Sequence, residues 1–241
     1  MTLETVADSA QPQMPGAAQT CPVIPPLEHG DHLTRREFER RYHAMSKTKK
    51  AELIEGIVYM PSPVRFKGHG APHFQIITWL GVYLSQTPGL SAGDNATVCL
   101  DPDNEPQPDV LLRREKSRGG RSDISADDYI EGAPELVVEI AGSSASYDLH
   151  EKLTAYRRNG VQEYLVWRVY EQQIDWFSLE DGSYVALAPD ENSVICSRIF
   201  PGLWLDVAAM LKGESTTFLA VLQQGMAAPE HQEIVAQLVA E

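Results

Sequence analysis

Three ionisable residues stand where an apolar residue would cost less, in the stretch from Pro106 to Tyr156. Asp109 lies in the segment PQPDVLL, Glu139 in ELVVEIAGSS and Lys152 in DLHEKLTAY. An ionised group among apolar neighbours is expensive unless it has a partner, a cation or access to water. Two carboxylates and an ammonium placed in this way indicate a metal-dependent hydrolytic site.

Strand geometry makes Asp109 and Glu139 a candidate metal site. Side chains alternate between the two faces of a strand, so Glu139 lies in the middle of one face of an expected strand 135–141. If this strand pairs with an expected strand 107–112, the two carboxylates come close together. Like charges at close range repel unless a proton or a divalent cation lies between them. Oxygen ligands suit Mg²⁺ or Mn²⁺ better than zinc, which predicts one of these two ions as the cofactor.

Lys152 belongs to the apolar stripe of an expected helix 148–159. Leu149, Lys152, Leu153 and Tyr156 follow the i, i+3, i+4, i+7 spacing of a core-facing stripe. A lysine at the edge of such a stripe commonly extends its ammonium into water, which is the simpler interpretation of this residue alone. Together with Asp109 and Glu139, a functional role for Lys152 is favoured instead.

Glu55 and His73 are further candidates. Glu55 is a third carboxylate among apolar residues, although its place before Gly56 also fits a simple turn. His69 and His73 are four residues apart and could share one helix face. The pattern HExxH is absent, so contact of His73 with a substrate phosphate is favoured over a histidine metal site.

A basic segment, RREKSRGGR, follows the strand expected to carry Asp109. Its basic residues are Arg113, Arg114, Lys116, Arg118 and Arg121. Such a segment is either a solvated polar loop or a contact surface for the DNA backbone, which basic side chains neutralise.

The 241 residues suit one domain with tails. We expect a disordered tail over 1–30, one folded domain over 31–211 and a peripheral helical tail over 212–241. Helices are expected from Thr34, over 68–86 with Phe74, Ile77, Leu80 and Leu84 buried, and from Asp148 as an N-cap, with a helical turn over 127–132. A strand pair or a bent strand is expected over 51–60, with Glu55-Gly56 at the break, and strands are expected over 161–168, 172–179 and 183–187.

Composition limits the cell compartment and the binding mode. The formal net charge is −14, from 34 acidic against 20 basic residues, which argues against strong non-specific nucleic-acid binding but leaves room for a local basic patch. Three widely spaced cysteines, Cys21, Cys99 and Cys196, fit reduced thiols. No secretory signal pattern or membrane-length apolar run is present in the sequence, which predicts a cytoplasmic protein.

Four segments in this order resemble the Uma-two family of proposed restriction endonucleases, in the PD-(D/E)XK nuclease superfamily: AELIEGIVYM, QPDVLL, ELVVEIA and EKLTAYRRNGVQEYLVW. The resemblance covers about residues 31–211. The superfamily pattern has a lysine two residues after the second acid, where this chain has Ala141. A lysine moved to the following helix, as Lys152 would be, is a known variation of that pattern. Gly142 stands where family members usually have a serine.

The resemblance implies an α/β (α+β) fold with a restriction-endonuclease-like core, in which helices flank a mixed central β-sheet and a β-hairpin region is added. It implies that Asp109 and Glu139 hold the divalent ion, with the main-chain carbonyl of Ile140 as a further ligand. Glu55 would bind a second ion or orient a water molecule. Lys152 would orient or help deprotonate the attacking water and offset charge on the phosphorane.

The sequence therefore predicts a Mg²⁺-dependent or Mn²⁺-dependent DNA endonuclease. A homodimer is expected, because cutting both strands of a duplex needs two sites. One alternative is a catalytically inactive relative that binds DNA or regulates. Another is a structural protein in which Lys152 pairs with Asp109 or Glu139 in a buried ion-pair network without metal affinity.

Overall fold

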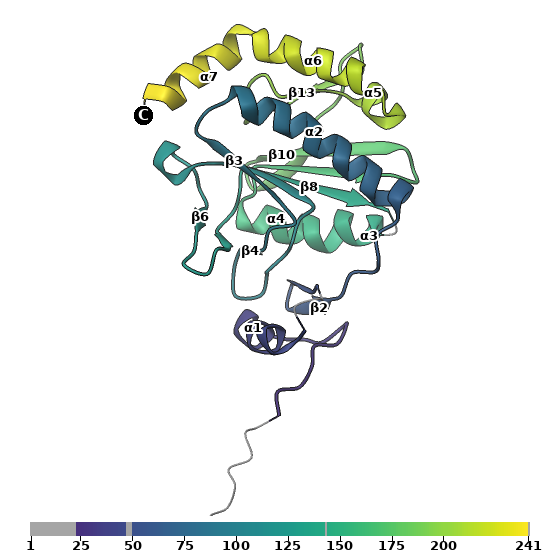
Figure 1. Ribbon diagram of the computed structural model, residues 1–241, viewed down its shortest axis with the longest axis vertical. Helices are drawn as coiled ribbons and strands as arrows, with labels where there is room; N and C mark the ends of the chain where they lie inside the picture. Colours follow the sequence, from purple (N-terminus) through teal and green to yellow (C-terminus); the bar gives the residue numbers. More distant parts are fainter. Residues whose placement is uncertain (1–22, 47–49, 143, 241) are drawn as a thin grey trace, which may run out of the picture.

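The computed structural model describes residues 23–46, 50–142 and 144–240 (Figure 1). Most of the expected N-terminal tail, residues 1–22, lies outside the described residues. Of the helices in the described part of the chain, none has both the length and the apolar character that a membrane crossing requires.

A six-stranded mixed sheet forms the centre of the protein, as the resemblance implies. The strand order is β11-β10-β9-β8-β5-β3, and only β8 and β9 run parallel. The strands are β3 (Leu90–Asp94), β5 (Val110–Arg114), β8 (Leu136–Ala141), β9 (Glu163–Arg168), β10 (Gln173–Glu180) and β11 (Ser183–Ala186). The two residues that close the hairpin from β10 to β11, Asp181 and Gly182, both have positive φ, as a tight hairpin turn requires.

Strand β8 is buried along its whole length and separates two apolar cores. Leu136, Val138 and Ile140 pack into the larger core, whereas Val137 and Ala141 pack into a smaller one. Because side chains alternate along a strand, Glu139 belongs to the face of the smaller core.

Helices cover both faces of the sheet (Figure 1). Helix α2 (Ala71–Gln86) and the C-terminal helices α5 (Val207–Lys212), α6 (Ser215–Ala227) and α7 (Pro229–Ala240) lie over the face of the larger core. Phe218 and Leu222 of α6 are fully buried in that core together with residues of α2. Helix α4 (Leu153–Asn159) covers the opposite face.

The expected buried stripe of α2 is confirmed at Leu80, half-buried at Ile77 and Leu84, and wrong at Phe74. Phe74 is 70% exposed, and the buried apolar side chains are Ile76, Trp79, Leu80 and Tyr83. Apolar residues run almost all round this helix, so periodicity alone does not select one face. The aromatic residues decide it, because Trp79 and Tyr83 bury their rings and donate hydrogen bonds to the carbonyls of Trp204 and Pro201.

An N-terminal unit packs beside the sheet. It comprises α1 (Arg35–Ala44) and a hairpin of β1 (Glu52–Ile54) and β2 (Ile57–Tyr59). Glu55 and Gly56 form the turn with φ of 51° and 73°, which is the geometry of a tight hairpin turn. The backbone of Leu53 exchanges two hydrogen bonds with that of Glu105, which holds β1 beside the segment that leads into β5.

Two smaller sheets complete the fold: β4 (Val98–Cys99) with β7 (Ile130–Glu131) and β6 (Asp123–Ile124), and β12 (Val194–Cys196) with β13 (Trp204–Asp206). The expected helical turn over 127–132 is wrong. Asp128 and Gly132 have φ of 66° and 88°, which no right-handed helix accommodates, and the segment instead turns and enters β7.

The helix after β8 begins earlier than expected. It runs through α3 (Ala145–Tyr147), a π-helical turn η3 (Asp148–Lys152) and α4, and it ends at Gly160 with φ of 79°. Asp148 as an N-cap is therefore wrong, and its carboxylate accepts a hydrogen bond from the Ser144 hydroxyl at 2.6 Å. The wider π turn brings residues four to five apart onto one side, so Asp148 and Lys152 both point inward and are buried.

Candidate active site

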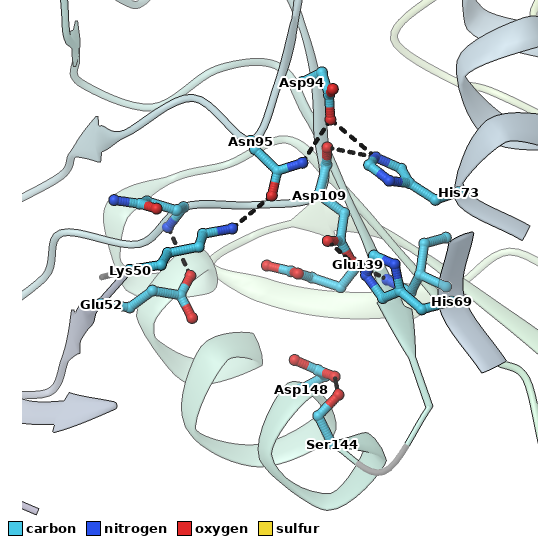
Figure 2. A network of polar contacts seen from close by, with 12 residues as sticks. Lys50, Glu52, His69, His73, Asp94, Asn95, Asp109, Glu139, Ser144 and Asp148 are labelled. Carbon is cyan, nitrogen blue, oxygen red and sulfur yellow. Dashed lines mark hydrogen bonds and ion pairs between the residues drawn. The ribbon is translucent and has the colours of Figure 1, made fainter. Parts of the chain in front are cut away.

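Asp109 and Glu139 come from neighbouring strands of the sheet. Val110 of β5 pairs with Val138 of β8, so the same antiparallel register continued by one residue sets Asp109 opposite Glu139. The main-chain N–H of Ile140 donates a 2.7 Å hydrogen bond to Oδ2 of Asp109. Figure 2 shows the two carboxylates close together, which is the convergence expected from the sequence.

Two histidines hold Asp109 from the side of α2. His69, in the π-helical turn η1 (Phe66–Gly70), places Nε2 2.9 Å from Oδ1 of Asp109. His73 places Nε2 3.0 Å from the main-chain oxygen of Asp109 and 3.1 Å from Oδ1 of Asp94 (Figure 2). One ligand atom from each of His69, His73 and Asp109 lies within 4.8 Å of the others. Both histidines therefore contact Asp109 directly. The sequence pattern does not predict this role, because the HExxH motif is absent.

Lys152 reaches back from the helix to the strand carboxylates. Its Nζ lies 2.9 Å from Oε1 of Glu139 and 3.1 Å from Oε1 of Glu52. The Tyr156 hydroxyl donates a hydrogen bond to the same oxygen of Glu139 at 2.9 Å. The main-chain N–H of Gln107 donates to Oε1 of Glu52 at 2.6 Å. All three charged groups are more than nine-tenths buried, so they form one desolvated network.

Acids outnumber bases in this cluster, which we define as Glu52, Asp109, Glu139, Asp148 and Lys152. Burial raises the pKa of Glu139 well above its ordinary value, and Asp109, Asp148 and Glu52 add to the rise while Lys152 opposes it. Burial likewise raises the pKa of Asp148 to about 6. The cluster has four carboxyl groups and one ammonium, so it can accommodate a further positive charge.

Lys152 and Asp109 are held in their charged forms. Burial alone would lower the pKa of Lys152, but the neighbouring carboxylates of Glu139 and Glu52 raise it well above its ordinary value. Burial alone would raise the pKa of Asp109, but hydrogen bonds from His69 and the Ile140 N–H lower it overall. Asp109 is therefore an anion ready to bind a cation.

The donor set fits a divalent cation. Excess acid, oxygen donors from Asp109 and Glu139, and adjacent imidazoles are a combination that Mg²⁺ or Mn²⁺ accepts, with Mn²⁺ more tolerant of nitrogen. The carbonyl of Ile140, which the resemblance implies as a ligand, accepts a hydrogen bond from the N–H of Gly142 at 3.2 Å. A carbonyl oxygen has a second lone pair, so this bond does not exhaust it.

Glu55 lies apart from these contacts. Its carboxylate pairs with Arg158 at 2.7 Å, and its N–H donates to the Asn104 side chain. It lines an open surface hollow of about 480 Å³ on the outer side of η3. Glu52, three residues earlier in β1, is the acid that contacts Lys152. Glu52 is 7% exposed. The sequence signal that could have identified it is an acid at the start of an apolar strand.

The basic segment lies at the other end of β5 from Asp109. Five residues of strand at about 3.3 Å each separate Asp109 from Arg114 by roughly 17 Å. Arg113 is 4% exposed and bonds to Ser91 and Ser122, so its guanidinium is not available to a phosphate.

The other basic residues of the segment differ in exposure. Arg114 and Arg118 are half-buried, whereas Lys116 and Arg121 are exposed. Arg114 donates to the carbonyl of Ile199. Arg121 donates to the carbonyl of Gly160, at the end of α4 remote from Lys152.

Other basic side chains stand next to the cluster. Arg65 and Lys67 are exposed and flank Phe66, which is 78% exposed. Lys67 and Phe66 share the turn η1 with His69, which bonds to Asp109. The sequence pattern did not identify Arg65, Phe66 and Lys67 as a site, because two basic residues separated by an aromatic one do not form a dense basic segment.

Comparison with known proteins agrees with the fold and identifies the family of the chain. The chain resembles the crystal structure of "a putative nuclease belonging to DUF820 from Anabaena variabilis", with a TM-score of 0.55 and 14% identity over 72% of this chain and 96% of that one. At that identity the likeness shows the fold. No match was found among curated proteins. The family model Uma2, described as "Putative restriction endonuclease", matches residues 35–208. The chain belongs to the Uma2 family.

Proposed function

We propose that the cluster is the active site of a DNA endonuclease that depends on Mg²⁺ or Mn²⁺. The observation that supports this most is the contact of Lys152 with Glu139 in a cluster that still carries excess acid around Asp109. A phosphodiester hydrolase needs a cation site, a means of activating water and compensation for charge on the phosphorane. Family membership points in the same direction.

Asp109 and Glu139 would hold the cation, with the carbonyl of Ile140 or the imidazoles of His69 and His73 completing the ligands. The bound ion would supply Lewis-acid polarisation of a phosphoryl oxygen. Glu52, rather than Glu55, is proposed as the further acid of the site, because Glu55 is engaged by Arg158.

The remaining polar residues prepare the site before substrate arrives. His69 fixes the rotamer of Asp109, and Tyr156 fixes that of Glu139. Lys152 remains protonated between Glu52 and Glu139 and would offset negative charge that develops on the phosphorane. As a cation it would orient the attacking water as a hydrogen-bond donor, and a carboxylate would accept the proton.

DNA is proposed to enter over η1 and the start of α2. Arg65 and Lys67 offer charge to the backbone next to Asp109, and the exposed ring of Phe66 offers a face on which a base could stack. His73 remains a candidate phosphate contact through its place beside Asp109. Two copies related by a twofold axis would cut both strands, so we propose a homodimer, which light scattering would test.

Plasmid nicking tests the function. Supercoiled plasmid is incubated with the protein in Mg²⁺, in Mn²⁺ and in EDTA, beside Asp109→Asn. We expect metal-dependent nicking that Asp109→Asn lowers by at least about a hundredfold. Glu52→Gln should lower it similarly, and Glu55→Gln, as the matched control, should leave it near the wild-type rate.

The alternatives give different results in the same series. A gel shift on DNA without nicking would identify an inactive DNA-binding relative. Neither binding nor nicking, with no thermal shift on adding Mg²⁺ or Mn²⁺, would identify a purely structural ion-pair network around Lys152. Loss of nicking in Glu55→Gln but not in Glu52→Gln would overturn the assignment of the further acid.

A further inference from the structure

A second group of metal-ligating side chains lies outside the cluster. It comprises Glu39 of α1, Cys99 of β4 and Glu105, which follows β4. One ligand atom from each of the three residues lies within 4.8 Å of the other two. Cys99 and Glu105 lie on the two sides of the turn 101–104, and the fold brings Glu39 of α1 to them from sixty residues earlier in the chain.

Two members of the group are buried, and one of them has an oxygen without a hydrogen bond. Cys99 and Glu105 are each 2% exposed, and Cys99 is a free thiol. Oε2 of Glu105 is buried and has no hydrogen-bond partner in the described part of the chain. Burying a carboxylate oxygen without a partner is costly, so native proteins seldom leave one without an ion, a water or a proton.

We propose that Glu39, Cys99 and Glu105 form a zinc-binding site separate from the cluster around Asp109. A thiolate and two carboxylates are ligands that Zn²⁺ accepts, and three protein ligands leave its fourth tetrahedral position for water. The thiolate selects Zn²⁺ over Mg²⁺, which prefers an all-oxygen site.

The surrounding charges favour a divalent ion. Ionised, the three ligands carry three negative charges, and Arg35, whose Nε lies 3.2 Å from Oε1 of Glu39, offsets one of them. A divalent cation offsets the other two. Glu131, the strand partner of Cys99 in β7, adds further negative potential from an exposed position.

The site would fasten the N-terminal unit to the body of the protein. Glu39 belongs to α1, whereas Glu105 exchanges backbone hydrogen bonds with Leu53 at 3.2 and 2.7 Å. Glu52, which contacts Lys152, is the residue before Leu53. The ion would therefore join α1, β4 and the strand that presents Glu52.

Cobalt substitution tests the proposal in the full-length, reduced, chelator-treated protein. Co²⁺ is titrated while thiolate-to-cobalt charge-transfer absorption is followed, and Zn²⁺ is then added in competition. We expect the band in the wild type and its displacement by Zn²⁺. Cys196→Ser, which changes the exposed thiol, and Asp109→Asn, which changes the cluster, should both retain the band.

Cys99→Ser should abolish the band. Because burial makes Cys99→Ser prone to misfolding, Glu39→Gln on the half-buried helix α1 gives an independent readout. It should retain the fold by circular dichroism and weaken Co²⁺ binding by at least about tenfold. No band in the wild type would overturn the site and leave a carboxyl pair that shares a proton. A band that persists in Cys99→Ser, or an affinity unchanged in Glu39→Gln, would also overturn it.

Discussion

The ammonium of Lys152 lies 2.9 Å from Oε1 of Glu139, although the two residues come from a helix and a strand thirteen positions apart. Ala141, on the same face of β8 as Glu139, is fully buried against the smaller core. A lysine side chain at this position would have to displace packed apolar neighbours. The π turn η3 instead delivers the ammonium from the helix that covers this face, and Glu52 holds it on its other side.

Removing the ammonium should affect both stability and activity. Lys152→Met leaves Glu52 and Glu139 without their buried counter-ion, so we expect the free energy of unfolding in EDTA to fall by about 3–5 kcal/mol. Denaturant unfolding measures this change, and plasmid nicking should be lost. Lys152→Met combined with Glu139→Gln should recover part of the stability and none of the nicking. If Lys152→Met alone is as stable as the wild type, the ion pair between Lys152 and Glu139 contributes nothing to the free energy of unfolding.

Asp148 should make stability depend on pH. Its pKa is about 6 when folded against 3.8 ordinarily, so between about pH 4 and pH 6 the folded state binds more protons than the unfolded state. Stability therefore falls as pH rises through this window, and the loss of on the order of 3 kcal/mol is complete above it. Asp148→Asn should match the wild type near pH 4 and exceed its stability at pH 7.5, measured by denaturant unfolding in EDTA.

The control for this effect is Glu151→Gln, an exposed acid in the same turn. Its stability should follow the wild-type pH dependence. A wild-type curve that is flat or rises between pH 4 and pH 6, with Asp148→Asn unchanged relative to it, would contradict the raised pKa.

Much of the fold could be predicted from local pattern. The run LVVEIA, from Leu136 to Ala141, is apolar on both faces except at Glu139, which predicts a central strand and an unusual acid at once. Glu55-Gly56 between apolar runs predicts a hairpin turn. These predictions succeeded because the information lies within a few residues. The strand Leu90–Asp94 was missed, because LSAGD contains few residues with strand preference.

What could not be predicted depends on distant contacts. The face of α2 is chosen by Trp79 and Tyr83 through carbonyls more than a hundred residues away. Glu52 becomes part of the cluster only because β1 is held beside Glu105. The basic segment follows Asp109 in sequence, yet a strand carries it to the far end of the sheet, so closeness in sequence did not mean closeness in space.

The surface over η1 should govern DNA affinity. Arg65→Ala with Lys67→Ala removes two exposed charges beside the cluster, so we expect weaker binding and a salt dependence of log K that is shallower by about 2. Fluorescence anisotropy at several salt concentrations measures both. Lys116→Ala with Arg121→Ala removes the same charge at the far end of β5 and should change the slope little. The opposite ranking of the two double variants would place DNA on the basic segment instead.

Gly142 should be required for the position of η1. A Cβ added at Gly142 would lie 2.9 Å from the main-chain oxygen of Gly68, which is backbone and cannot rotate away. Gly68 precedes His69, which contacts Asp109, so a displacement of Gly68 would also move His69. We expect Gly142→Ser to lower stability by about 1–3 kcal/mol and to reduce nicking.

A matched glycine separates this effect from a general one. A Cβ at Gly81, on the exposed side of α2, meets nothing within 4 Å, so Gly81→Ala should raise stability by roughly 0.5–1 kcal/mol and leave nicking unchanged. Thermal unfolding and plasmid nicking of both variants decide the matter. Full stability and nicking in Gly142→Ser would mean that η1 shifts freely. In that case the contact between His69 and Asp109 would not depend on close packing at Gly142.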